Sequence, residues 1–160
     1  MRGTLSLWLR WLHVLGVVTW FGGAIFIAAV LVPLARTFDD PAQRTLLIRE
    51  AARRFRVVGW VGLCLIVLSG VGNIVLNPWL LSSGLFQVKL ALVALVLALS
   101  VVHDFVLGPR ATLNPNPSLR VWASWVARVT LLLGLLVIFL GLALRGEPFP
   151  IGISGVGAYG

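Results

Sequence analysis

LSLWLRWLHVLGVVTWFGGAIFIAAVLVP, residues 5–33, is the stretch that decides the fold. Arg10 is its one formal charge, and the run is longer than the ~20 apolar residues that cross a ~30 Å hydrocarbon layer as a helix. Further apolar windows of spanning length lie at about 57–76, 85–107 and 122–144. The pattern predicts an all-α integral membrane protein, built as a four-transmembrane-helix bundle.

Composition supports the same fold class. Hydrophobic residues make up 59% of the 160 residues and charged residues 11%, which is too apolar for a soluble domain. The net charge of +8 comes from arginines that flank the spans, so we expect no nucleic-acid partner. The lone cysteine, Cys64, is expected as a small apolar filler. We expect one transmembrane domain over 1–145 and a flexible, glycine-rich tail over 146–160.

Arginine distribution predicts the orientation. The connectors after the first and third spans are richer in arginine than the opposite side, which carries Arg2, Arg10 and Arg145. The positive-inside rule therefore places both termini outside the cytoplasm, in a multi-pass protein of a bacterial-type inner (plasma) membrane. In the first connector, Asp39-Asp40-Pro41 is typical of a helix start. We expect an amphipathic helix at about 41–55, either on the membrane surface or continuing the second span.

The second arginine-rich connector, residues 108–120, contains three prolines and two asparagines. These residues favour an irregular turn. Glycines inside the spans are expected to let helices approach closely, and Gly22 and Gly23, beside Trp20, could also make room for a flat cofactor.

Ionisable side chains inside spans are costly and are functional candidates by default. Here they form two layers. With both termini outside, His13 lies ~12 Å and Lys89 ~8 Å from the outer ends of their helices, at 1.5 Å per residue. Asn73 falls near the same level. These three side chains are predicted to meet in the outer third of the bundle.

The inner layer contains His103, Asp104 and Arg128. Asp104 and Arg128 have the signs of an ion pair between the third and fourth spans, and His103 could join it. Lys89 and His103 project from nearly the same helix face but lie ~21 Å apart along the axis. One cofactor can therefore hardly use both layers.

The residues alone leave the role of His13 open between metal ligand, proton carrier and packing residue. Neutral imidazole is the usual haem ligand, because one nitrogen supplies a lone pair while a neighbour holds the other. Lys89 could equally extend its amine to the outer interface.

Three stretches resemble a known family: WLHVLGVVTWFGG at 11–23, RRFRVVGW at 53–60 and LFQVKLALVALVLALSVVHDFVLGPR at 85–110. Together they are similar to the copper resistance protein D (CopD) family and, more distantly, to HemJ-type protoporphyrinogen oxidases. The resemblance covers roughly residues 8–130 and implies a four-helix membrane bundle. For the HemJ-type relatives it also implies b-type haem, with His13 and Lys89 at the positions of the functional pair. FIAAVLVPLAR, at 26–36, departs from the HemJ-type continuation of the first helix.

We therefore expect a membrane protein with haem b whose iron is bound by His13. Lys89 is the candidate catalytic residue, as a sixth ligand or as a partner of a propionate or substrate. Arg10 is expected to bind a propionate, Asn73 to supply a hydrogen bond, and Trp20 to line the site. The predicted function is electron transfer or oxidation of a small molecule such as a quinol or porphyrinogen.

The sequence leaves other functions open. His103 could bind a second haem or copper, and a copper-transporting protein without redox catalysis could use His13 and His103. The CopD resemblance implies such transport, although soft Cu(I) prefers sulfur ligands and this chain offers only Met1 and Cys64. A third hypothesis is a structural subunit that binds no cofactor. The lipid bilayer is the expected partner, and two copies could associate as a homodimer.

Overall fold

Four long helices form the structure. The computed structural model describes residues 2–113 and 116–146, so the predicted tail lies outside the described residues except for Gly146. Helical stretches long and apolar enough to cross a membrane are Gly3–Ala35, Pro41–Leu76, Gly84–Ala111 and Pro117–Leu144. The described part contains no strand. The predicted all-α, four-span architecture is confirmed.

The first span is one continuous helix with two wide turns in it. It consists of α1 (Arg2–Val17), η1 (Val18–Gly22), α2 (Gly23–Phe26), η2 (Ile27–Leu31) and α3 (Val32–Ala35), of which η1 and η2 are π-helical. A π-helical turn bonds residue i to i+5 instead of i+4, and therefore rotates the following side chains to a different face. Such turns are frequent at functional sites.

The second span, α4 (Pro41–Leu76), begins at the predicted helix start. The carboxylate of Asp40 accepts a hydrogen bond from the Ala42 N–H at 2.8 Å, and Pro41 occupies the first turn. Residues 41–55 do not form a separate surface helix but continue directly into the second membrane span. The Arg44 guanidinium donates to the carbonyls of Arg36 (3.4 Å) and Phe38 (3.0 Å), where the preceding helix ends.

A short 3-10 turn, η3 (Pro78–Ser82), leads into the second half of the molecule. There α5 (Gly84–Val101), η4 (Val102–Leu107) and α6 (Gly108–Leu113) form one continuous helix, and α7 (Pro117–Gly146) returns beside it. The expectation of an irregular turn was wrong for residues 108–113, which are helical. Pro109, which lacks an N–H, lies inside this continuous helix just after the π-helical turn η4, where the bonding pattern already departs from that of an α-helix.

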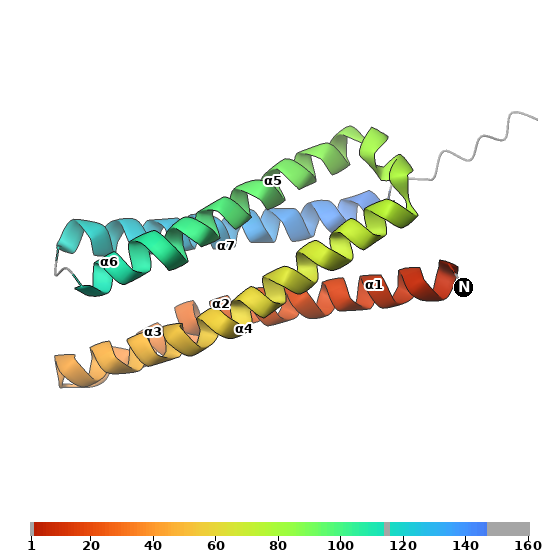
Figure 1. Cartoon of the computed structure of the whole chain (residues 1–160). Helices are drawn as coiled ribbons and strands as arrows, with labels where there is room; N and C mark the ends of the chain where they lie inside the picture. Colours follow the sequence, from red (N-terminus) through yellow and green to blue (C-terminus); the bar gives the residue numbers. More distant parts are fainter. Residues whose placement is uncertain (1, 114–115, 147–160) are drawn as a thin grey trace, which may run out of the picture.

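The helices pair as two hairpins. In the first hairpin (residues 2–76) α1 runs along α4, and in the second (84–146) α5 runs along α7, while close backbone approaches between the hairpins are few (Figure 1). A Cβ built on Gly16 would lie 2.7 Å from the carbonyl oxygen of Gly62. Glycine at this crossing therefore allows the main chains of α1 and α4 to touch, as expected for helices packing in lipid.

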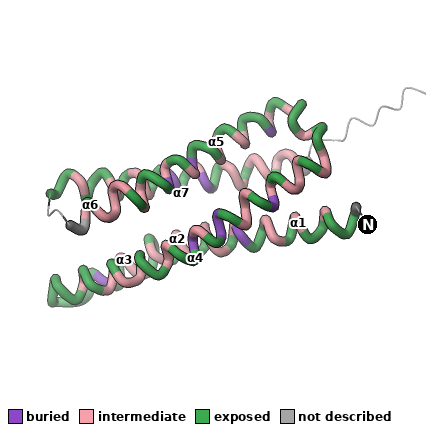
Figure 2. Tube along the Cα trace, viewed as in Figure 1, coloured by how far each residue is buried: buried purple, intermediate pink, exposed green. Residues whose placement is uncertain are grey.

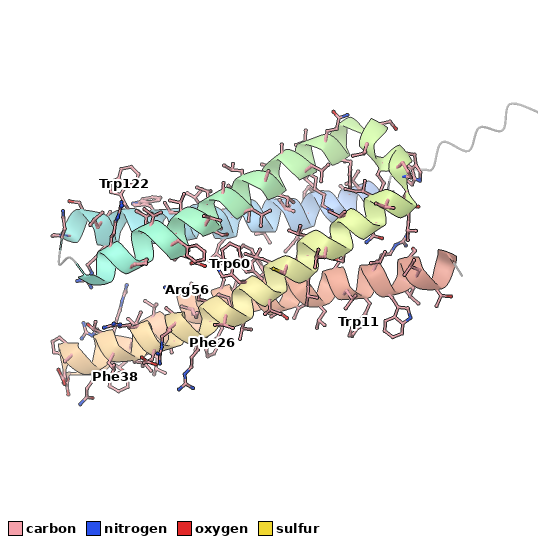
Figure 3. All side chains as sticks on the ribbon, in the orientation of Figure 1. Trp11, Phe26, Phe38, Arg56, Trp60 and Trp122 are labelled. Carbon is pink, nitrogen blue, oxygen red and sulfur yellow. The ribbon has the colours of Figure 1, made fainter. Side chains whose placement is uncertain are left out.

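Burial is confined to the faces between helices, and the outward faces are exposed (Figure 2). Trp11 and Trp122 project from outer faces, whereas Trp60 points from α4 toward the second hairpin (Figure 3). The start of α1, the turn η3 and the end of α7 lie at one end of the bundle (Figure 1). His13, near the start of the first span, and Lys89, near the start of the third, therefore share that half of the molecule.

Candidate functional site: a cavity between the two hairpins

A cavity of about 300 Å³ lies between the hairpins, in the half of the bundle that contains His13 and Lys89. All four spans contribute to its wall, which is apolar apart from three side chains. The polar members are His13, Asn73 and Lys89, and the aromatic members are Trp20, Phe21 and Phe86. A largely apolar cavity with a few converging polar groups is the usual form of a cofactor or small-molecule site. We call it the inter-hairpin cavity.

The imidazole of His13 is oriented by α4. Its Nδ1 lies 3.0 Å from the main-chain carbonyl oxygen of Ile66 and 3.0 Å from the Ser69 hydroxyl oxygen. A carbonyl oxygen can only accept, so Nδ1 carries the proton. The Ser69 hydroxyl donates its own hydrogen to the carbonyl of Leu65 and therefore also accepts from His13. With the proton on Nδ1, the lone pair of the neutral ring is on Nε2.

This arrangement matches that of metal-binding histidines. Such residues almost always donate their other N–H to a carbonyl, carboxylate or water, which sets the tautomer and the ring orientation. Gly70 borders the ring, and a Cβ there would make ordinary van der Waals contact with the His13 Cε1 atom at 3.7 Å. The donor chemistry of His13 therefore fits a haem-iron ligand, with Nε2 as the ligating atom.

Lys89 brings a cation to the same cavity from the second hairpin. Its amine lies over the ring of Phe86, 5.9 Å from the centroid, and 3.4 Å from where a Cβ on Gly141 of α7 would be. Lys89 and His13 line the same cavity from different hairpins. The structure thus brings together the first-span imidazole and the third-span amine.

Aromatic side chains from η1 form one side of the cavity. Trp20 and Phe21 are adjacent in sequence and both line it, with ring centroids 6.2 Å apart. A Cβ on Gly134 of α7 would lie 3.2 Å from the Phe21 ring and 3.3 Å from the Trp20 ring. Gly134 therefore makes the room for these rings.

Gly22 and Gly23 do not make room at the site, contrary to the expectation from the sequence. A Cβ on Gly23 would collide with the ring of Phe55 on α4, so this glycine serves helix packing. A Cβ on Gly22 would meet nothing within 4 Å. Neither residue lines the inter-hairpin cavity.

Two of the other candidates occupy different positions. Asn73 lines the cavity, and its amide donates to the Ser69 carbonyl on the same helix at 2.9 Å. Arg10 is exposed and does not line the cavity. The structure therefore groups Asn73, but not Arg10, with His13, Lys89 and Trp20.

His103 belongs to a separate polar cluster in η4. Its Nδ1 lies 2.8 Å from Oδ1 of Asp104, and the Trp60 indole N–H of the first hairpin donates to Oδ2 of Asp104 at 3.0 Å. None of these three residues lines the inter-hairpin cavity. The cluster joins the hairpins at another level of the bundle.

The expected ion pair between Asp104 and Arg128 is not formed within residues 2–113 and 116–146. Both carboxylate oxygens of Asp104 already have partners on His103 and Trp60. Arg128 is exposed and lies 5.6 Å from the centroid of the Trp125 ring.

Within the described residues, no group of three or more His, Cys, Asp and Glu side chains is close enough to hold a bare metal ion. The inter-hairpin cavity instead presents one imidazole, one amine and aromatic walls. This set would suit haem, because the porphyrin already holds the iron and the protein adds only one or two further ligands.

Several members of the site were not found from the sequence. Ser69, Gly134 and Gly141 are small residues of apolar spans, and nothing in the local pattern separates them from packing residues. Ser69 had one usable signal, since it lies on the same helix four residues before Asn73 and therefore on a similar face.

The fold and the cavity define a class: a four-helix membrane protein with a histidine and a lysine facing a site between two helix hairpins. The family model described as copper resistance protein D matches residues 49–144, which is more than half of the chain. The chain belongs to the copper resistance protein D family. It is accordingly a multi-pass membrane protein of the bacterial inner-membrane type.

Two relatives extend this comparison. An uncharacterized protein of Aquifex aeolicus (strain VF5) is 30% identical over 138 residues, covering 84% of this chain and 91% of the relative. A protoporphyrinogen IX oxidase of Synechocystis sp. (strain ATCC 27184 / PCC 6803 / Kazusa) is 26% identical over 95 residues, covering 56% of this chain and 45% of the relative. No solved structure matches the chain.

Proposed function

We propose that the protein is a membrane haem protein that would hold haem b in the inter-hairpin cavity, with Nε2 of His13 as the atom that would bind the iron. The observation that carries this proposal is the donation of the His13 Nδ1–H to the Ile66 carbonyl, which leaves the ligating nitrogen unprotonated in an apolar cavity. When bound, haem supplies one-electron exchange. The residues of the chain supply ligation, shape and charge.

The other cavity residues have matching roles. Trp20 and Phe21 offer apolar surface to a flat ring system, and Gly134 keeps space behind them. Lys89 would provide a cation for a carboxylate of the bound group or of a substrate, or would itself bind the iron. Because the hairpins make few close backbone approaches, the cavity can widen by a shift of one hairpin against the other.

Electron transfer, or oxidation of a small molecule such as a quinol or porphyrinogen, is the activity proposed for this site. The similarity to a protoporphyrinogen IX oxidase supports a porphyrinogen as one substrate class. Lys89 is the proposed catalytic residue, because an amine facing the cavity can hold an acidic substrate beside the bound group.

The test is an absorption spectrum of detergent-purified protein from cells supplied with haem precursor. We expect a Soret band in the wild-type protein and its loss in His13→Ala. His103→Ala is the matched control, since it removes an imidazole from a membrane helix outside the cavity. Colourless wild-type protein, or equal loss of the band in both variants, would refute the proposal.

Copper handling is the second candidate, supported by the family to which the chain belongs. It would use His13 and His103, which the structure places at separate polar sites. Copper uptake by cells that express the protein, lowered by both His13→Ala and His103→Ala, would favour this function over the haem site.

A further inference from the structure

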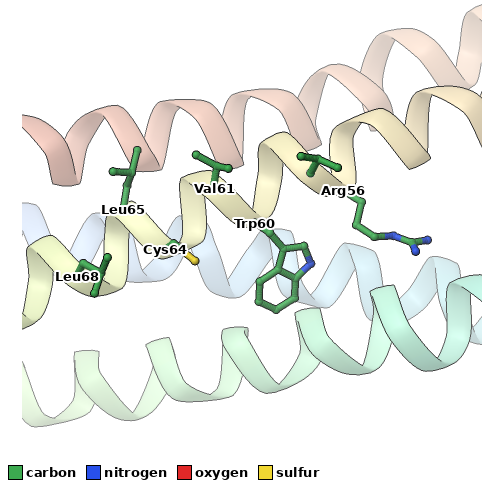
Figure 4. A pocket seen from close by; sticks show the side chains of 7 residues that line it. Arg56, Trp60, Val61, Cys64, Leu65 and Leu68 are labelled. Carbon is green, nitrogen blue, oxygen red and sulfur yellow. The ribbon is translucent and has the colours of Figure 1, made fainter.

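An open groove of about 520 Å³ runs along α4 (Figure 4). It is distinct from the inter-hairpin cavity, contains neither histidine nor lysine, and all its walls come from one helix. We call it the α4 groove, and its residues are Arg56, Val57, Trp60, Val61, Cys64, Leu65 and Leu68.

The groove has a cation at one end only. Arg56 stands at the boundary between the arginine-rich first part of α4 and the apolar window that starts at Val57. Figure 4 shows its guanidinium extending from the helix beyond Trp60. Arg53, one turn earlier, is paired with Glu50 at 2.7 Å. Among the described residues, Arg56 forms no hydrogen bond or ion pair, although its side chain is partly buried.

The length of the groove matches one leaflet of a bilayer. From Arg56 to Leu68 the helix rises ~18 Å at 1.5 Å per residue. Half of the ~30 Å hydrocarbon layer is ~15 Å. The walls over that length are apolar, and Val57, Val61 and Leu68 are exposed. A chain lying in the groove with its polar head at Arg56 would therefore end near the bilayer centre.

Trp60 gives the groove a fixed aromatic wall. Its indole N–H donates to Asp104 at 3.0 Å, and its ring packs against Phe105 with centroids 5.4 Å apart. The ring is thus held between the hairpins, and its remaining surface faces the groove.

We propose that the α4 groove binds one acyl chain of an anionic phospholipid, whose phosphate is held by Arg56. A guanidinium matches phosphate geometry through paired N–H donors, whereas a neutral quinone head has no charge to offer it. The arginines that precede Arg56 on α4 add attraction for an anionic leaflet. This binding is independent of the haem site.

Native mass spectrometry of the detergent-purified protein tests the proposal, with phosphatidylglycerol and phosphatidylcholine of identical acyl chains as probes. We expect wild-type protein to retain phosphatidylglycerol about fivefold more than phosphatidylcholine. Arg56→Gln should abolish this preference. Arg54→Gln is the matched control, because it removes an exposed arginine two residues away that does not line the groove.

A second variant tests the acyl chain rather than the charge. Leu68→Trp fills the apolar end of the groove from an exposed position and leaves every arginine in place. Retention of phosphatidylglycerol should fall, while circular dichroism and thermal unfolding stay as in wild type. Three results would overturn the proposal: no preference in wild type, equal losses in Arg56→Gln and Arg54→Gln, or undiminished lipid retention in Leu68→Trp.

Discussion

The Nδ1 atom of His13 on α1 and the main-chain carbonyl oxygen of Ile66 on α4 lie 3.0 Å apart. The ring is therefore oriented by the backbone of a neighbouring helix, which no side-chain substitution on α4 removes directly. Ser69 supplies a second acceptor at the same distance. Orientation of the ring thus depends on the packing of the first hairpin.

Ser69→Ala tests how much the second acceptor contributes. The His13 N–H keeps its bond to Ile66, so we expect haem to remain bound but with about tenfold lower affinity, at the low end of the range for such supporting bonds. Ser100→Ala is the control, since Ser100 is also buried but bonds only to Val96 of its own helix. Haemin titration monitored at the Soret band measures both, and equal effects would contradict the assigned role.

Replacing Lys89 tests its contact with the bound group. Lys89→Leu removes the amine and adds no group that can bind iron, so we expect haem to stay bound to His13 with an altered absorption spectrum. Arg128→Leu is the control, because it removes a cation that is exposed and outside the cavity. Identical spectra for Lys89→Leu and wild type would exclude Lys89 as a ligand of the iron.

Gly16→Ala should separate α1 from α4. The added Cβ would lie 2.7 Å from the Gly62 carbonyl oxygen, a main-chain atom that cannot rotate away. We expect the free energy of unfolding to fall by about 1–3 kcal/mol, the usual cost of overpacking. Gly22→Ala, whose Cβ would meet nothing within 4 Å, is the control. Unfolding in mixed micelles measures the difference, and equal stabilities would contradict the close crossing.

Trp60→Phe removes the indole donor while keeping an aromatic ring. Oδ2 of Asp104 then loses its partner on the first hairpin, so we expect about 1–3 kcal/mol of destabilisation. Trp122→Phe, at an exposed position on α7, should have little effect. Thermal unfolding in detergent compares the two, and a Trp60→Phe protein as stable as wild type would show that the bond contributes nothing.

The orientation predicted from the arginines is testable separately. A reporter active only outside the cytoplasm, fused after the last residue, should be active, and one fused within residues 36–40 should be inactive. The reverse pattern would invert the predicted topology while leaving the cavity unchanged.

The four spans could be predicted because the length of each apolar run can be counted in the sequence. The similar depth of His13 and Lys89 followed from the constant rise per residue of a helix. The rotation of each helix about its own axis, which decides the neighbour that a side chain faces, could not be predicted. Asp104 lies in the π-helical turn η4, and its partner is Trp60 rather than Arg128. A local change in residues per turn moves side chains to another face, and the hydrophobic pattern does not record it.

The same limit explains the glycines. Gly22 closes the π-helical turn η1 and Gly23 follows it, so their position next to Trp20 in sequence did not place them next to the cavity. Gly134, from a span more than a hundred residues further on, fills that role instead. Contacts between distant spans depend on the packing of whole hairpins, which the local hydrophobic pattern does not reveal.

The turn η3 is the one short link between two helix pairs that each bury their own crossing. In lipid, spans insert first and associate afterwards, so each pair can insert as an independent unit. The imidazole arrives with one unit and the amine with the other. Two fragments separated at this turn and produced in the same cell should therefore form a complete pocket only when they associate. A prosthetic group bound in the pocket would contact both fragments and stabilise their association.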